Sequence, residues 1–157
     1  MTLGGAEPSG LIGVGYEGQN IDSFIDMLLI QGVTHLVDVR LTPISRKPGF
    51  SKTALSHALA AADIGYMHLP ALGNPKSNRA GFAGDTAEVA NARQLFVRQI
   101  RRPAAESALD TIAELAASQR VAVLCFEANE ERCHRHVVLT QVRKRASNVS
   151  GSRRPRH

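Results

Sequence analysis

Aromatic side chains are scarce in this chain of 157 residues, since they make up 4% of the sequence and tryptophan is absent. Alanine, leucine, valine and isoleucine must therefore fill the core. Proteins that bind single-stranded nucleic acid by base stacking need several exposed aromatic rings. The composition argues against that class of protein, and the length suits a single domain.

A long apolar segment is also missing, because no run approaches the roughly 18 residues that a membrane-spanning helix requires. The N-terminal segment MTLGGAEPSG lacks the basic and apolar stretches of a secretory signal. We therefore expect a cytoplasmic protein that makes no contact with a membrane. Its two cysteines, Cys125 and Cys133, are too few for a disulfide framework. In a reducing compartment they would be thiols, metal ligands or core residues.

Positive charge is concentrated at the C-terminal end. The chain has a formal net charge of +5, and six lysines and arginines in residues 143–157 leave residues 1–142 with a net charge of −1. The folded part thus lacks the electrostatic footprint of a DNA-binding protein. We expect residues 143–157 to be a disordered basic tail, either solvated or able to contact nucleic acid or another acidic partner.

Short apolar runs alternate with segments of helical periodicity. We expect strands at residues 11–15, 35–40, 66–69 and 121–126, and helices after Asn20, Ser51, Asp85, near Pro103 and after Asn129. This alternation predicts one three-layer α/β domain over residues 11–142, Rossmann-like or flavodoxin-like, with a mostly parallel sheet covered by helices on both faces. Residues 1–10 should be disordered. Ligands of such domains bind at the carboxyl ends of the strands.

The densest group of reactive side chains follows the last expected strand. Cys125 ends that strand, Glu127 lies in the next loop, and Cys133, His134 and Arg135 occupy the first turns of the last helix. A thiol near a helix N-terminus and a cation favours its thiolate, and an imidazole can act as its base. We therefore predict that Cys125, Glu127, Cys133 and His134 are catalytic, with buried core cysteines as the alternative.

A metal site is a further alternative. Cys125, Cys133 and His134, with His68 or His136 as a fourth ligand, form a set that suits zinc. Their spacing matches no zinc finger or ribbon. The sequence therefore requires no metal or other cofactor.

Charged residues also gather at the end of the second expected strand. A buried Asp38 needs either a structural partner or a catalytic use, and we include it among the catalytic residues. Arg40, Arg46 and Lys47 border a proline-containing loop and, with Arg135, could bind a phosphate or carboxylate. Solvated loop charges are the alternative.

The segment from Gly13 to Gly18 has G-x-G-x-x-G spacing where a strand leads into a helix. No acidic residue ends the next strand, as a dinucleotide-binding site would require. A plain tight turn is therefore the alternative. We expect Tyr16 and Glu17 in this turn, together with His68 at the end of the third strand, to contact the ligand.

Several motifs together resemble the bacterial family catalogued as domain of unknown function 488. They are Val14–Gly18, Leu36–Arg40, Pro48–Phe50, Tyr66–Gly73 and the pair Cys125–Glu127 with Cys133–Arg135. The similarity spans about residues 11–142. It implies a small α/β domain in which these motifs share one pocket, and it implies no established activity.

A more distant likeness is to rhodanese-type sulfurtransferases, in which strands ending in Asp-Val-Arg and in a catalytic cysteine share one sheet. Residues 36–40 and 121–125 look similar. The loop after Cys125 departs from that pattern because it carries Glu127, Glu130 and Glu131, whereas a persulfide needs amides and cations around it.

The functional expectation is an enzyme or nucleotide-handling domain that acts on a phosphate-bearing ligand through this Cys/His/Glu/Arg pocket. A non-catalytic module that binds a ligand, or nucleic acid through residues 143–157, is the alternative from another class. The zinc site is the third.

Overall fold

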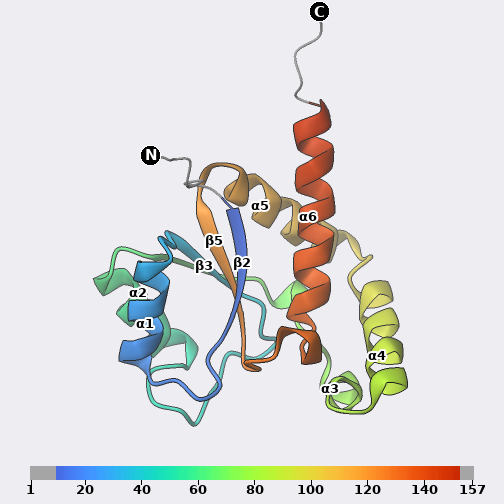
Figure 1. The fold of residues 1–157 in the computed structure, drawn as a ribbon, viewed down its shortest axis with the longest axis horizontal. Helices are drawn as coiled ribbons and strands as arrows, with labels where there is room; N and C mark the ends of the chain where they lie inside the picture. Colours follow the sequence, from blue (N-terminus) through green and yellow to red (C-terminus); the bar gives the residue numbers. More distant parts are fainter. Residues whose placement is uncertain (1–9, 153–157) are drawn as a thin grey trace, which may run out of the picture.

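The computed structural model describes residues 10–152, with side chains up to Arg145. Four parallel strands form one sheet in the order β2-β5-β3-β4 (Figure 1). The strands are β2 (Gly10–Gly15), β3 (His35–Asp38), β4 (Gly65–His68) and β5 (Arg120–Cys125). The α-helices are α1 (Ile21–Ile30), α2 (Lys52–Ala61), α3 (Lys76–Phe82), α4 (Thr86–Gln99), α5 (Pro103–Ser118) and α6 (Arg135–Ser152). The predicted parallel α/β domain is confirmed.

Helices cover both faces of the sheet, so the domain has two hydrophobic cores. Figure 1 shows α1 and α2 on one side and α4, α5 and α6 on the other. Successive residues of β5 point to opposite faces. Val121 and Val123 pack into the core beneath α4, α5 and α6, whereas Ala122 and Leu124 pack into the core beneath α1 and α2. This double burial explains the continuous apolar sequence of β5.

Helix starts are specified by short local signals. The Asn20 side chain accepts a hydrogen bond from the Ser23 backbone N–H at 2.8 Å. Asp85 and Glu88 form a complete capping box at the start of α4. Pro103 occupies the first turn of α5, where its missing N–H costs no helical hydrogen bond. These three of the five helix starts expected from the sequence are confirmed.

The long segment between β4 and α4 contains helical structure that was not expected from the sequence. It contains the 3₁₀ helix η1 (Pro70–Leu72) and α3. Leu72 and Phe82 are both buried in the core that α4, α5 and α6 cover. Burial of these two apolar side chains stabilises structure in a segment rich in glycine, proline and asparagine.

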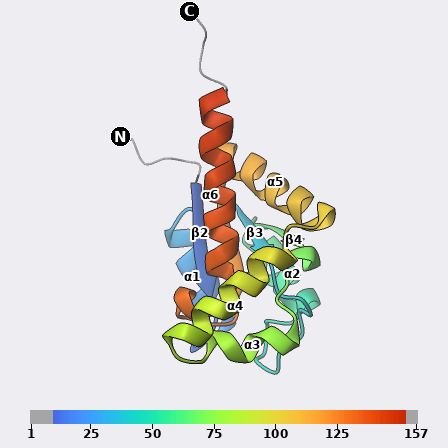
Figure 2. The ribbon, with the colours of Figure 1, turned by 90° about the vertical axis from the view of Figure 1, so that its right-hand side faces the viewer.

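The C-terminal boundary differs from the sequence-based expectation. Helix α6 continues beyond Val142 to Ser152, so residues 143–152 are helical rather than disordered. Arg145 pairs with Glu106 and Asp110 of α5, which holds part of the basic segment against the fold. Figure 2 shows α6 extending beyond the sheet. The expected disorder of residues 1–9 and 153–157 lies outside the described residues.

The start of α6 also differs from expectation. Asn129 caps the 3₁₀ helix η2 (Glu130–Arg132) rather than α6, since its side chain accepts from the Glu131 N–H. Cys133 and His134 therefore lie just before α6. Among the described residues, no helix has the length and apolar character needed to cross a membrane.

Candidate functional site

A cavity of about 270 Å³ opens at the carboxyl edge of the sheet. Because all four strands are parallel, their C-terminal ends meet at this edge. The cavity brings together six residues that the sequence analysis selected: Tyr16, Arg40, Cys125, Glu127, Cys133 and His134. The predicted position at strand ends therefore agrees with the cavity that the structure contains.

Two thiols and one imidazole form a buried cluster on the cavity wall, which we call the thiol–imidazole cluster (Cys125, Cys133 and His134). His134 Nδ1 lies 3.8 Å from Cys125 Sγ and 3.6 Å from Cys133 Sγ. Glu127 Oε1 is 3.7 Å from Cys125 Sγ. The Arg135 backbone N–H donates to Cys133 Sγ at 3.4 Å. Each sulfur thus faces polar groups rather than packing as an inert core atom.

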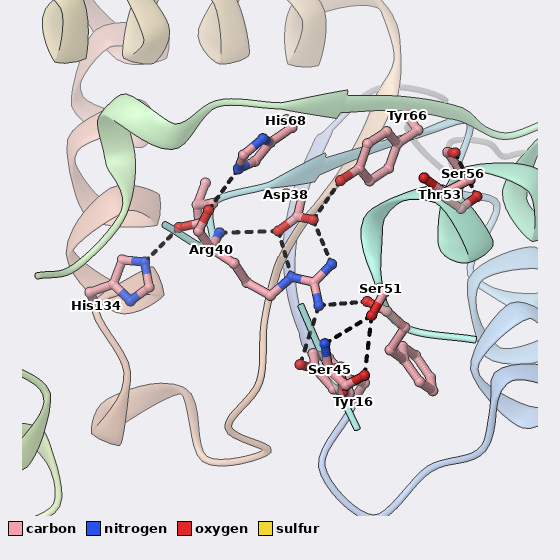
Figure 3. A network of polar contacts seen from close by, with 12 residues as sticks. Tyr16, Asp38, Arg40, Ser45, Ser51, Thr53, Ser56, Tyr66, His68 and His134 are labelled. Atoms are coloured by element: carbon pink, nitrogen blue, oxygen red, sulfur yellow. Dashed lines mark hydrogen bonds and ion pairs between the residues drawn. The ribbon is translucent and has the colours of Figure 1, made fainter. Parts of the chain in front are cut away.

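The orientation of the His134 ring is fixed from its far side. Its Nε2 lies 2.9 Å from the Val39 carbonyl oxygen (Figure 3). A carbonyl only accepts, so Nε2 carries a proton and the neutral ring presents an unprotonated Nδ1 to the two sulfurs. Phe96 packs edge-on against the ring, with 5.1 Å between centroids. Nδ1 is consequently held ready to accept a proton or bind a cation.

Contact between the two thiols shifts their pKa values in opposite directions. The hydrogen bond from Cys133 and the contact with His134 lower the pKa of Cys125 despite its burial. Burial, followed by the hydrogen bond to Cys125, raises the pKa of Cys133. Burial lowers the pKa of His134, but the Cys125 contact outweighs it and the net shift is upward. Burial and the neighbouring Cys125 charge raise the pKa of Glu127. Of the two thiols, Cys125 is therefore the more acidic.

Asp38 forms a structural network in the sheet rather than part of the cavity wall. Its carboxylate is fully buried and accepts from Arg40 Nε at 2.9 Å, Arg40 Nη2 at 2.7 Å and Tyr66 Oη at 2.6 Å (Figure 3). Arg40 Nη1 donates to the Phe50 carbonyl at 2.6 Å and lies 3.3 Å from Tyr16 Oη. The predicted catalytic role of Asp38 thus has a structural alternative that accounts for its burial.

This network also shifts the pKa values of Arg40 and Tyr66. Burial disfavours charge on Arg40, but Asp38 outweighs it and the pKa of the guanidinium is raised. Burial and the hydrogen bond to Asp38 raise the pKa of Tyr66 as well. Arg40 faces the cavity with its charge already neutralised.

Five other predicted ligand-binding residues do not line the cavity, namely Glu17, Arg46, Lys47, His68 and Arg135. Arg46 is exposed on its loop, and His68 Nε2 lies 2.8 Å from the Arg40 carbonyl oxygen. Arg135 is buried and donates to the Val14 carbonyl at 3.0 Å. Glu17 accepts from the Ala128 N–H at 3.0 Å. His68, Arg135 and Glu17 therefore support the elements around the cavity.

The glycines of the G-x-G-x-x-G segment allow close packing. A Cβ at Gly15 would lie 2.0 Å from the Glu127 carbonyl oxygen, and one at Gly13 would lie 2.3 Å from Glu130 Oε1. The Glu17 backbone N–H also donates to the Phe126 carbonyl at 2.9 Å. The turn therefore fixes the loop that carries Glu127, which supports the plain-turn alternative.

Sequence reasoning missed two further cations that line the cavity, Arg79 and Arg132. Arg79 Nε donates to the Asn74 carbonyl at 3.4 Å, and Arg132 Nη1 donates to the Gly84 carbonyl at 2.9 Å. Neither arginine belongs to an ion pair among the described residues. The sequence signal that points toward Arg79 is the long segment 70–84, rich in glycine, proline and asparagine, because loops of this length are often functional. The position of Arg79 beside the cavity depends on the fold of α3.

The thiol–imidazole cluster is also the part of the described chain that could hold a metal. Its three ligand atoms all lie within 4.8 Å of one another. His136, one expected fourth ligand, lies 3.6 Å from Glu130 and is not on the cavity wall. His68, the other, is held by the Arg40 carbonyl.

Comparison with known proteins identifies a family but no characterised relative. No curated protein and no solved structure gave a significant match to the chain. The model of one family, described as "Domain of unknown function DUF488", matches residues 20–142. The match covers most of the sheet, the cavity and the thiol–imidazole cluster. The chain therefore belongs to the DUF488 family, as its motifs indicated.

Proposed function

We propose that the chain is an enzyme that acts on a small phosphate-bearing molecule bound in the cavity. One observation carries this proposal: one cavity is lined by a nucleophile-bearing cluster and by two arginines, Arg79 and Arg132, that pair with no carboxylate among the described side chains of residues 10–145. Its volume of about 270 Å³ lies just below the roughly 300–1,000 Å³ of ordinary ligand pockets, which favours a metabolite-sized substrate.

Arg79 and Arg132 would bind the phosphate. Each uses one nitrogen on a backbone carbonyl, which leaves other N–H groups for a ligand. A guanidinium can donate two parallel hydrogen bonds to phosphate oxygens. Arg40 lines the same cavity, but its bonds to Asp38 reduce its value for holding a second anion.

Glu127 would transfer protons in the reaction. Its raised pKa allows the carboxyl group to hold a proton closer to neutral pH than an ordinary glutamate does. It lies beside Cys125, so proton transfer and nucleophilic attack would occur at one place. The thiol–imidazole cluster supplies the nucleophilic centre, and the reaction class is nucleophilic displacement or addition assisted by Glu127.

Binding can be tested before the substrate is known. Sugar phosphates and nucleoside monophosphates should stabilise the protein against heat, whereas the same compounds without phosphate should not. Arg79→Gln and Arg132→Gln should each weaken binding about tenfold, a loss of about 1.4 kcal/mol. Arg101→Gln removes the same charge from an exposed residue that does not line the cavity and should bind normally. Equal affinity in all variants would reject the phosphate-binding role.

Turnover can then be followed by NMR on the compounds that bind. Glu127→Gln should retain binding but lose at least about 100-fold in kcat, within the range for a general acid or base. The matched Glu114→Gln variant changes an exposed glutamate on α5 and should be fully active. Binding of phosphate compounds without any conversion would favour the non-catalytic alternative.

The basic C-terminal segment has no part in this proposal. Contact with nucleic acid through residues 143–157 stays a separate prediction. Arg145 is already paired with two carboxylates of α5, which leaves less free charge there than the sequence suggested.

A further inference from the structure

We infer that Cys125, Cys133 and His134 bind a zinc ion whose fourth coordination position opens into the cavity. The three ligand atoms come from the end of β5 and from the segment just before α6. All three side chains are buried, with exposed fractions of 7%, 1% and 5%. Three soft or borderline ligands converge on one point that is shielded from bulk water.

The spacing of the ligand atoms fits one tetrahedral ion. Zn–S bonds of about 2.3 Å and a Zn–N bond of about 2.05 Å, at tetrahedral angles, separate sulfur from nitrogen by about 3.6 Å. The measured separations from His134 Nδ1 are 3.8 Å to Cys125 Sγ and 3.6 Å to Cys133 Sγ. A zinc ion could therefore enter with little movement of the side chains.

Hydrogen bonds alone do not explain why both sulfurs lie close to His134 Nδ1. The single lone pair on Nδ1 of His134 can accept one thiol proton well, yet both sulfurs lie within reach of it. A cation among the three atoms would contact a lone pair from each of them. Two thiolates, one neutral imidazole and Zn²⁺ have no net charge, so burial of the loaded cluster is not opposed by an uncompensated charge.

The outer contacts are those of a metal-binding histidine and cysteine. Metal-bound histidines commonly donate their second ring N–H to a backbone carbonyl, as His134 does to Val39 at 2.9 Å. The Arg135 N–H donates to Cys133 Sγ and would stabilise a thiolate. Sulfur and imidazole ligands together select zinc over magnesium, calcium or manganese.

The fourth position would be open. His68 is bound elsewhere and His136 lies outside the cavity wall, so the described residues supply three nitrogen and sulfur ligands. Structural zinc sites have four protein ligands, whereas catalytic sites have three and a water. This part of the inference rests on the proposed function: a zinc ion held by these three residues would supply Lewis-acid activation of a water molecule in the open position, beside the cavity in which the substrate would bind. In the loaded protein the sulfurs are thus ligands and water is the nucleophile.

Metal content of the untagged full-length protein is the first measurement. We expect about one zinc per chain, well above the amount that trace contamination would leave. Substitution by cobalt(II) should give thiolate-to-cobalt charge-transfer bands and the visible bands of a tetrahedral site. X-ray absorption of the unmodified protein should show two sulfurs at about 2.3 Å. Absence of zinc after expression in zinc-supplemented medium, with no binding on titration, would overturn the inference. So would a cobalt spectrum without thiolate bands.

Variants then assign the ligands. Cys133→Ser should weaken zinc binding by at least about 100-fold, more than most changes in outer contacts do. His136→Gln and Glu127→Gln should bind zinc normally, because neither residue is a ligand in this inference. Unchanged affinity of Cys133→Ser would reject the assigned site, and the spectra of the unmodified protein decide the matter if that variant does not fold.

The two proposals can fail separately. Zinc bound at this site in a protein that converts no phosphate-bearing compound would support the metal inference and reject the proposed function. Turnover by fully metal-free protein, unaffected by added zinc, would support the proposed function and reject a catalytic metal.

Discussion

Asp38 and Arg40 form a two-point ion pair inside the sheet, with Arg40 Nε 2.9 Å from Oδ1 and Nη2 2.7 Å from Oδ2. The two residues are separated by Val39 alone, and Val39 offers its carbonyl to His134. The ion pair therefore fixes the strand end that orients the thiol–imidazole cluster. Disturbing it should affect both stability and the cavity.

Asp38→Asn should lower the free energy of unfolding by about 3–5 kcal/mol, because it leaves Arg40 buried without its counter-charge. Urea denaturation would measure the loss. The double variant Asp38→Leu, Arg40→Met should lose less, since it removes both charges. Asp26→Asn, at an exposed position on α1, is the matched control and should stay within about 0.5 kcal/mol of the parent. A harmless Asp38→Asn would show that the ion pair is not structural.

Tyr66 should make stability sensitive to alkaline pH. Its pKa is raised in the folded protein, so the protonated phenol is favoured by folding. That contribution is fully present below about pH 10, the ordinary tyrosine pKa, and is lost as pH rises toward the higher folded pKa. Urea midpoints measured from pH 7 to 11 should fall in the parent. Tyr66→Phe should start lower by about 1.5 kcal/mol, the loss of a hydrogen bond to a charged group, and should fall less steeply.

Gly15→Ala should displace the loop that carries Glu127, because the new Cβ would lie 2.0 Å from the Glu127 carbonyl oxygen. We expect about 1–3 kcal/mol of destabilisation from this overpacking. Hydrogen exchange should also accelerate at the Glu17 and Ala128 amides, whose bonds join the turn to the loop. Gly18→Ala is the control: it has a positive φ but open space, so it should cost about 1 kcal/mol without changing those amides.

Removal of residues 153–157 should leave the free energy of unfolding unchanged, because the ion pairs of Arg145 are retained. Three arginines are lost. If the protein binds duplex DNA, a plot of the logarithm of its binding constant against the logarithm of salt concentration should then be shallower by about 2 to 3. Filter binding at several salt concentrations would measure it, with Arg101→Gln as a single-charge control. An unchanged slope would reject a nucleic-acid role for this end of the chain.

Local signals in the sequence were enough to predict the four strands and five of the six α-helices of the described residues, but not α3. Asn20, Asp85 with Glu88, and Pro103 act within a few residues of the helices they start, so each could be identified without the fold. Cys133 and His134 were assigned to the last helix because Asn129 resembled its cap. That error came from a competing local signal, since the same asparagine caps η2 first.

The side chains of the candidate site were partly predictable for a different reason. Cys125 and Arg40 lie at or just after strand ends, and parallel strands bring their carboxyl ends together. Arg79 and Arg132 could not be found this way, because helix α3 and the turn η2 place them beside the cavity through tertiary packing. Arg135 shows the reverse, since adjacency to His134 in sequence did not bring it into the cavity.

The alternation of strands and helices, the parallel sheet and the edge at which polar residues gather could all be predicted from the chain's amino acids, because they follow from periodicity and short-range capping. Tertiary structure alone decided that Asp38 neutralises Arg40 and that Cys125, Cys133 and His134 converge within 4.8 Å. Such contacts depend on strand order and on how segments distant in sequence pack, which no local pattern specifies.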